Sequence, residues 1–324
     1  MKKYDVICIG ELIIDMISQE PGRSLSEAEN FSKFAGGAPA NVAVGLANFD
    51  RNVAFIGRVG DDSFGKYLRQ KMEKHSINTD YLIAVRGHST RLAYVSIDEQ
   101  GERSFEFLEK SPADLALMAS DISQIELNQS KVIHFGSLGL ADTKARKEFI
   151  KILNVVNSTD TLISFDPNYR SSLWKSESEA YRVLNAFAAK AHILKMDIEE
   201  AKFLCNCHST DEILKSLTFK TSQIVAITMG ENGCILKNRK YSVKIPGFKV
   251  NVVDSTGCGD AFMAALIDGI ISFEKTHKSL SEEELYTIGT RANAAGAIAA
   301  TRYGAMSNPP TRSEIDQFIK SEIY

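Results

Sequence analysis

Apolar and polar positions along this chain alternate between two periods, one typical of buried β-strands and one typical of amphipathic helices. Short apolar runs that predict strands cover residues 4–10, 53–58, 131–135, 161–165, 192–195 and 223–228. Between them, apolar residues repeat at helical spacing over 40–49, 64–75, 144–156 and 179–190. This alternation predicts an α/β domain whose mostly parallel sheet is covered by helices on both faces. In such sheets ligands bind beyond the carboxyl ends of the strands.

Two stretches interrupt the alternation and predict a second, smaller sheet. Residues 12–34 lack a helical pattern, and 90–108 read as two alternating strands around a Glu-Gln-Gly turn at 99–101. We expect both to form one small antiparallel sheet, a lid that closes over the strand ends and excludes water. The predicted lid covers 12–34 and 88–109, and the predicted core covers 1–11, 35–87 and 110–324. Two unrelated surface hairpins are the alternative.

Composition narrows the class of protein without identifying it. The 324 residues carry a formal net charge of −3, and 44% of them are hydrophobic, as in ordinary globular proteins. The chain has no excess of basic residues, so we do not expect a nucleic-acid partner. Glu11 and Asp15 interrupt the first apolar run, and Asp268 interrupts the longest one, so we expect neither a signal peptide nor a membrane span. Five scattered cysteines fit a reducing compartment, and we expect a cytoplasmic protein.

A glycine-rich turn near the end of the chain is the strongest candidate for a phosphate site. Residues 254–262 read DSTGCGDAF and lead into an apolar helical stretch. Gly257 and Gly259 would let backbone N–H groups converge, and the helix that follows adds the positive end of its dipole, which together form an anion hole. Asp260 at the rim would repel a bound phosphate, but it suits a base directed at an attacking hydroxyl. A capping aspartate in a glycine-rich turn is the alternative.

Two other glycine patterns do not predict phosphate binding. Residues 60–67 read GDDSFGKY, close to a P-loop, but Tyr67 replaces the Ser or Thr that binds magnesium. Asp61 and Asp62 would direct negative charge at the phosphate, so we expect a turn capped by acids ahead of a helix. The stretch ICIGEL at 7–12 has one glycine and lacks the dinucleotide-binding fingerprint.

The stretch GGAPANVAVGLANF at 36–49 predicts a helix start that faces a ligand. Its proline suits a first helical turn, and Gly36 and Gly37 allow the backbone to approach a ligand closely. Asn41 is a polar residue on the first turn of an otherwise apolar helix, where it could bond a sugar hydroxyl or cap the helix. Asp15, just beyond the first strand, could meet it at the strand ends. Asp and Asn together suit adjacent hydroxyls.

Taken together and in this order, the motifs resemble the PfkB (ribokinase-like) carbohydrate kinases. GGAPAN and DSTGCGDAF are similar to the two family signatures. Further blocks resemble other family segments: FIGRVGDDSFG at 55–65, FDPNYRSSLW at 165–174, ITMGENG at 227–233 and NAAGAIAATRYGA at 293–305. The resemblance covers the whole chain. It implies a ribokinase-like three-layer α/β/α fold with a small β-sheet lid, and phosphorylation of a sugar by ATP.

The resemblance also implies a role for each matching position. The implied catalytic group is Asp260 as the base, with an anion hole formed by Gly257, Cys258 and Gly259. The implied sugar contacts are Asp15, Gly36, Gly37, Asn41, Asn168 and Arg170. The implied ATP contacts are Lys195, Thr228, Gly230, Gly233 and Asn293. The implied metal positions are Glu200 and Asp197 for Mg²⁺ and phosphate, and Asp254 for a monovalent cation such as K⁺.

Two positions depart from the family pattern. Cys258 stands where alanine is usual, and it should leave the turn intact while adding an oxidisable thiol. Asp197 stands where the family's Asn-x-x-Glu motif has asparagine, and it could strengthen a magnesium site or cap the following helix.

Lys195 could contact a phosphate or simply end a strand. His134, in VIHFGS, is expected to be a buried core histidine.

The sequence therefore predicts a kinase that uses ATP and Mg²⁺ and forms a homodimer through its lid. Fructose is the preferred acceptor, because GGAPAN and DPNYR together look most like fructokinases. The nearest alternative is 2-keto-3-deoxygluconate kinase, whose acidic substrate would need an arginine such as Arg91 or Arg170. Alternatives of other classes are a non-catalytic sugar-binding regulator, disfavoured by the retained Asp260, and an NAD oxidoreductase, disfavoured by the missing fingerprint.

Overall fold

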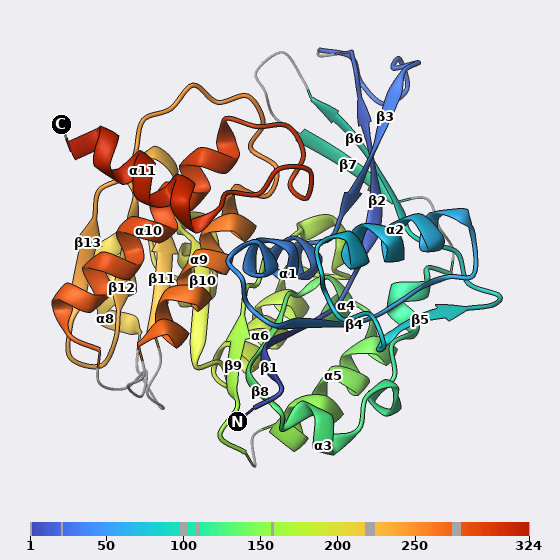
Figure 1. The fold of residues 1–324 in the computed structure, drawn as a ribbon, viewed down its shortest axis with the longest axis horizontal. Helices are drawn as coiled ribbons and strands as arrows, with labels where there is room; N and C mark the ends of the chain where they lie inside the picture. Colours follow the sequence, from blue (N-terminus) through green and yellow to red (C-terminus); the bar gives the residue numbers. More distant parts are fainter. Residues whose placement is uncertain are drawn as a thin grey trace.

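A large, mostly parallel sheet forms the centre of the molecule. The computed structural model describes residues 2–20, 22–97, 103–107, 111–156, 159–217, 224–273 and 280–323. Within them, the large sheet consists of β1 (Tyr4–Ile9), β4 (Val53–Gly60), β5 (Leu82–Val85), β8 (Ser130–Phe135), β9 (Leu162–Phe165), β10 (Ile193–Asp197), β11 (Ile224–Thr228), β12 (Cys234–Lys237) and β13 (Ser242–Ile245). Their order is β13-β12-β11-β10-β9-β8-β1-β4-β5, and only the β11–β12 and β12–β13 pairings in it are antiparallel (Figure 1).

Helices cover both faces of this sheet, because successive residues of its strands point to opposite sides. In β1, Val6 and Cys8 join one core cluster, while Ile7 and Ile9 join the other. The first cluster packs against α1 (Ala38–Asn48), α2 (Ser63–Lys74), α9 (Cys258–Ser272), α10 (Glu282–Ala300) and α11 (Arg312–Ile323). The second packs against α3 (Gln124–Leu127), α4 (Leu138–Ala141), α5 (Thr143–Val156), α6 (Glu177–Ala188), α7 (Ile198–Cys205) and α8 (Thr210–Ser216). The fold is thus the three-layer α/β/α arrangement that the sequence predicts.

Local patterning predicted these elements closely. Every strand and helix predicted for the core is present, and each end lies within two residues of the predicted one. Short 3₁₀ helices η1 (Ala113–Ala116), η2 (Ala119–Asp121), η3 (Ser171–Leu173) and η4 (Gly230–Asn232) lie in the connections. Among the described residues, no helix is both long enough and apolar enough to cross a membrane.

A smaller sheet rises from the carboxyl ends of the core strands (Figure 1). It contains β2 (Ile13–Ser18), β3 (Phe31–Gly36), β6 (Leu92–Ile97) and β7 (Arg103–Phe107) in the order β3-β2-β6-β7. The prediction of a purely antiparallel sheet is wrong, because β2 and β6 pair in parallel. Both strands leave the core after a parallel strand and therefore run outward in the same direction. The predicted turn at 99–101 lies outside the described residues, and the division into core and lid stays a prediction.

His134 and Asp62 take the structural roles expected for them. The His134 side chain is buried on β8, and its Nδ1 lies 3.0 Å from Ser164 Oγ on β9. Burial lowers the pKa of His134 to about 3, so the ring is neutral in the core. Asp62 is the N-cap of α2, where its Oδ1 accepts a hydrogen bond from Gly65 N at 2.8 Å. Its Oδ2 accepts from Thr90 N, also at 2.8 Å, which ties α2 to the start of β6.

Replacing Asp62 tests this cap. Asp62→Ala removes the acceptor for Gly65 N and for Thr90 N, so we expect the free energy of unfolding to fall by about 1–2 kcal/mol. Asp62→Asn keeps one side-chain oxygen and should cost less than half as much. Urea unfolding followed by circular dichroism measures both variants. Equal stability of Asp62→Ala and the unchanged protein would contradict the cap.

Candidate active site

The first turn of α9 carries Asp260 at the place where two segments far apart in the sequence meet. Gly257 is the N-cap of this helix in a left-handed conformation with φ 78°, and a Cβ there would collide with Ala305. Asp260 is 9% exposed, and Asn41 Nδ2 donates a hydrogen bond to its Oδ2 at 2.7 Å. Asn41 lies on the first turn of α1, so the two glycine-rich motifs of the sequence form one site.

Burial and neighbouring charges change the acidity of Asp260. Burial raises the pKa of Asp260 to about 6, and the hydrogen bond from Asn41 acts against this rise. This value also includes the Asp166 carboxylate, which raises the pKa, and the charges of Lys195 and Arg170, which lower it. A carboxyl group with this pKa is ionised at neutral pH yet basic enough to accept a proton from a reacting group.

Lys195 supplies positive charge beside the helix start. Its Nζ lies 2.8 Å from Asp166 Oδ2 and close to Gly259, where a Cβ would lie 3.0 Å from it. Burial lowers the pKa of Lys195, but the carboxylates of Asp166 and Glu200 outweigh burial and hold the pKa above its usual value. The ammonium group therefore stays charged and, with the N-terminus of α9, makes this corner attractive to anions.

A cleft of about 660 Å³ opens between the small sheet and the carboxyl ends of the core strands. The predicted site residues that line it are Asp15, Gly37, Asn41, Asn168, Arg170, Lys195, Asp197, Thr228, Gly257, Gly259 and Asp260. The cleft walls carry several carboxylates and amides, so this space suits a ligand with many hydroxyl groups.

A second pocket of about 290 Å³ adjoins the first and has a different character. The predicted residues that line it are Thr228, Gly230, Gly233, Cys258, Gly259 and Asn293. Its other walls include Phe248, Val250 and Phe262, which offer flat apolar surface. Thr228 and Gly259 line both pockets, so a ligand in the second can extend into the first beside Asp260.

Four predicted residues line neither pocket: Gly36, Arg91, Glu200 and Asp254. Gly36 contributes to the cleft indirectly, because the Asp15 carboxylate occupies the place where a Cβ of residue 36 would be. Asp254 accepts hydrogen bonds from Thr256 N at 2.8 Å and from Gly304 N at 3.1 Å. These bonds fix the turn that precedes α9.

Arg91 differs most from its predicted role as a partner for a substrate carboxylate. It is 6% exposed, and its guanidinium pairs with Asp114, with Nη2 3.0 Å from Oδ2. The guanidinium carbon also lies 5.2 Å from the centre of the Phe107 ring. Because Asp114 already neutralises Arg91, this arginine supports the base of the small sheet behind Phe107 of the cleft wall.

Asp197 and Glu200 form a capping box at the start of α7. Asp197 Oδ1 accepts from Glu200 N, and Glu200 Oε2 accepts from Asp197 N, each at 2.8 Å. Glu200 Oε1 accepts from Tyr169 N at 2.7 Å, which holds the loop that carries Asn168 and Arg170. Of the two alternatives for Asp197, the helix cap is confirmed, while its carboxylate also lines the cleft.

Comparison with known proteins agrees with this geometry. The family model described as pfkB family carbohydrate kinase matches residues 3–312. The chain belongs to the pfkB family of carbohydrate kinases. It is 35% identical over 319 residues to probable fructokinase-2 of Arabidopsis thaliana, an alignment that covers 98% of this chain and 96% of the relative.

Solved structures of the family resemble the chain over nearly its whole length. Fructokinase from Vibrio cholerae O395, with fructose, ADP and calcium bound, has a TM-score of 0.86 and 30% identity, and the match covers 97% of this chain and 98% of that one. Fructokinase from Xylella fastidiosa with bound ATP has a TM-score of 0.88 and 28% identity, with coverage of 98% and 99%. The ribokinase-like fold and the carbohydrate kinase class therefore hold for this protein.

Sequence reasoning missed two buried carboxylates of the site, Glu11 and Asp166. Glu11 lines the cleft, and its Oε1 accepts a hydrogen bond from Ala38 N at 3.1 Å. Asp166 pairs with Lys195 and accepts from Asn168 N at 3.2 Å. Each acid directly follows or closely follows an apolar strand, at the sheet edge where ligands bind. That position along the chain was the signal that could have identified them.

Glu11 makes the stability of the fold depend on pH. Burial raises the pKa of Glu11 from 4.5 to about 8, so between these values the folded chain keeps a proton that the unfolded chain releases. The free energy of unfolding therefore falls as pH rises, by at most about 1.4 kcal/mol per pH unit for this group. Glu11→Gln should remove this contribution, as measured by urea unfolding at pH 5.5, 6.5 and 7.5. Glu199→Gln, at an exposed position, should keep the original slope, and an unchanged slope in Glu11→Gln would contradict the assignment.

Proposed function

We propose that this protein transfers the γ-phosphate of ATP to the primary hydroxyl of fructose, which yields fructose 6-phosphate and ADP. The observation that carries the proposal is the place of Asp260, buried at the start of α9 where the polar cleft and the apolar pocket share Gly259. A base at that junction faces an acceptor on one side and a phosphate on the other.

The apolar pocket suits the nucleoside part of ATP. A purine ring can pack against Phe248, Val250 and Phe262, while its phosphates extend past Thr228 toward Gly259. Asn293 Nδ2 donates to Pro246 O at 2.9 Å, which joins α10 to the loop after β13 and shapes this wall. The related fructokinase from Xylella fastidiosa was solved with bound ATP, which supports the same nucleotide here.

The polar cleft suits a neutral sugar. Asn41 Oδ1 is buried and accepts no hydrogen bond from the described residues, so a sugar hydroxyl can donate to it. Asp15 and Asp260 make this wall acidic, which disfavours a substrate carboxylate. Arg91, one of the two arginines expected to bind an acidic sugar, is neutralised by Asp114. Arg170 does line the cleft, and it keeps 2-keto-3-deoxygluconate in the panel of acceptors to be tested.

The names and bound ligands of related proteins support fructose as the acceptor. The curated proteins that match this chain over nearly its full length include probable fructokinase-2 of Arabidopsis thaliana and fructokinase-1 of Zea mays. The Vibrio cholerae structure carries fructose together with ADP. These matches and the acidic cleft wall, which disfavours an acidic sugar, point to the same substrate.

The reaction is an in-line displacement. The hydroxyl oxygen attacks the γ-phosphorus while its proton passes to Asp260, and the bond from phosphorus to the bridging oxygen of ADP breaks. Backbone N–H groups of the turn from Gly257 to Asp260, together with Lys195, stabilise the charge on the transferred group. Asn41 holds the Asp260 carboxylate in a fixed orientation through its 2.7 Å hydrogen bond.

The proposed cations fit this site in different ways. Among the described residues, no three His, Cys, Asp or Glu side chains are grouped to hold a metal ion. Mg²⁺ commonly keeps water and substrate phosphates as ligands and needs only one or two carboxylates, a role open to Asp197 on the cleft wall. Glu200 would act through the helix cap. The expected K⁺ near Asp254, the closing motion of the lid and the homodimer formed through it stay predictions.

A panel of acceptors tests the proposed function directly. ATP consumption is measured with Mg²⁺ and K⁺ and with fructose, 2-keto-3-deoxygluconate, ribose, tagatose phosphate or adenosine. Selective turnover of fructose is the expected result. Turnover of the keto acid alone would reassign the cleft to an acidic sugar, and ATP binding without turnover of any acceptor would favour a sugar-binding regulator.

Replacing the proposed base tests the mechanism. Asp260→Asn keeps the shape of the side chain but cannot accept the proton, so kcat should fall by roughly 10²–10⁴-fold. Thermal shift with ATP should remain close to that of the unchanged protein, because the second pocket is intact. Full turnover in a folded Asp260→Asn variant would rule out Asp260 as the base.

The acidity of Asp260 sets the expected pH profile. Because burial raises the pKa of Asp260 to about 6, the fraction of ionised base falls below that pH. We expect kcat/KM for fructose to drop about tenfold per pH unit below pH 6. The residual activity of Asp260→Asn should lack this limb. A limb that persists in the variant would assign the titration to another group.

A further inference from the structure

Helices α1 and α9 meet in register at three successive points. At the cleft end, Asn41 bonds to Asp260. In the middle, Gly45 approaches Ala264 so closely that a Cβ on Gly45 would lie 2.8 Å from the Ala264 Cβ. At the far end, Arg51, just beyond α1, pairs with Asp268 on α9, with Nε 2.6 Å from Oδ1. Residue numbers rise together on both helices, so the two run side by side in the same direction.

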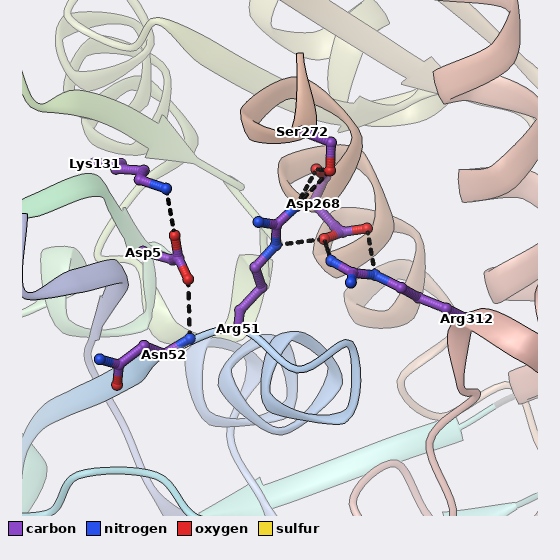
Figure 2. Close-up of polar contacts among 7 residues, drawn as sticks. All are labelled: Asp5, Arg51, Asn52, Lys131, Asp268, Ser272 and Arg312. Atoms are coloured by element: carbon purple, nitrogen blue, oxygen red, sulfur yellow. Dashed lines mark hydrogen bonds and ion pairs between the residues drawn. The ribbon is translucent and has the colours of Figure 1, made fainter. Parts of the chain in front are cut away.

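The far contact is a three-residue cluster centred on Asp268 (Figure 2). The Asp268 side chain is 8% exposed, and its Oδ1 also lies 2.6 Å from Nη2 of Arg312 at the start of α11. Arg51 Nη2 donates to Asp268 O at 3.2 Å and contacts Ser272 Oγ. One buried carboxylate thus joins the end of α1, the middle of α9 and the start of α11.

Two other carboxylates, Asp5 and Asp50, act on these arginines through their charge, but neither is paired with them. Figure 2 shows Asp5 bound to Lys131, with Nζ 2.6 Å from Oδ1, and to the backbone N of Asn52 at 3.0 Å. Asp50 adds negative charge near Arg312. Asp268 is therefore the anion that the Arg51 and Arg312 guanidinium groups share.

We infer that Asp268 is a positioning residue for the phosphoryl-transfer reaction, acting through the register of α1 on α9 to hold Asn41 against Asp260. Eight residues separate Asp268 from Asp260, about 12 Å along a straight helix, so the effect is carried by the helices and not by contact with substrate. The effect on phosphoryl transfer rests on the proposed kinase function. The packing of α1 on α9 can be tested on the protein without substrate.

The close approach at Gly45 explains why the far contact matters. Two helices that touch at a glycine have one tight crossing point, and a contact at each end prevents rotation about it. Without the Asp268 carboxylate, α1 loses the ion pair that holds its end against α9, and the guanidinium groups of Arg51 and Arg312 repel each other. The 2.7 Å bond from Asn41 is then the contact that lengthens, at the opposite end.

The first test removes the charge of Asp268. Asp268→Asn should lower kcat about 10- to 100-fold, because small misplacements of reacting groups cost that much, while KM for ATP changes less than threefold. Weakening the bond from Asn41 should raise the pKa of Asp260. That pKa is measured by NMR on protein with ¹³C-labelled aspartate, assigned by the loss of signal in Asp260→Asn. The control Asp316→Asn breaks the ion pair of α11 with Arg291 on α10 and should change neither quantity.

The second test changes the register without changing charge. Gly45→Ala places a methyl group against Ala264 and should produce the same fall in kcat and the same rise in the pKa of Asp260. Adding Ala264→Gly removes that collision and should restore both quantities. This pair of variants also covers the case in which Asp268→Asn does not fold.

The readouts separate the two proposals. If the unchanged protein phosphorylates no acceptor, the proposed function fails, but the NMR titration still measures the register. An unshifted pKa of Asp260 in both folded Asp268→Asn and folded Gly45→Ala overturns the inference. A fall in kcat that tracks lost thermal stability equally in Asp316→Asn also overturns it, since that result indicates a general structural role.

Discussion

The hydrogen bond from Asn41 to Asp260 is the contact on which the site depends. It joins residues 219 positions apart in the chain, each on the first turn of a helix that begins at a glycine-rich turn. Because both groups are buried, the bond is shielded from competing water and fixes the carboxylate in one orientation. The two helices must pack in register for the bond to form, so the packing of one whole face of the sheet converges on this pair.

Buried charge is unevenly distributed around this contact. Glu11, Asp166, Glu200 and Asp260 lie at or near the strand ends, with Lys195 as the buried cation among them. Burial raises the pKa of Glu11, Glu200 and Asp260, which records a free-energy cost of keeping them ionised in the fold. Such a cost is typical of a functional site, where charged groups are held ready for a ligand at the expense of stability. The same groups would be a poor choice for a purely structural corner.

The two pockets divide the task of recognition by their chemistry. The apolar pocket is built by the end of β11 and η4, by the loop after β13, by α10 and by the start of α9, all from the second half of the chain. The polar cleft draws residues from both halves, including β2, the loops after β1 and β9, and the end of β10. Gly259 at the start of α9 lines both pockets, so at this point a phosphate chain can pass between them without a side chain in the way.

Period and turn chemistry in the sequence predicted six strands of the large sheet, four of the helices that cover it, the segments of the small sheet and the two glycine-rich helix starts, because these follow from local spacing. The strands β5, β12 and β13 were not among the predicted ones. The motif resemblance added the kinase class and most residues that line the pockets. Only the tertiary structure decided the parallel pairing of β2 with β6 and the neutralisation of Arg91 by Asp114. Each of these depends on a partner brought close by folding. The shared carboxylate of Asp268 is the clearest case: in the sequence it was only a charge that interrupts an apolar run, and packing turned it into the junction of three helices.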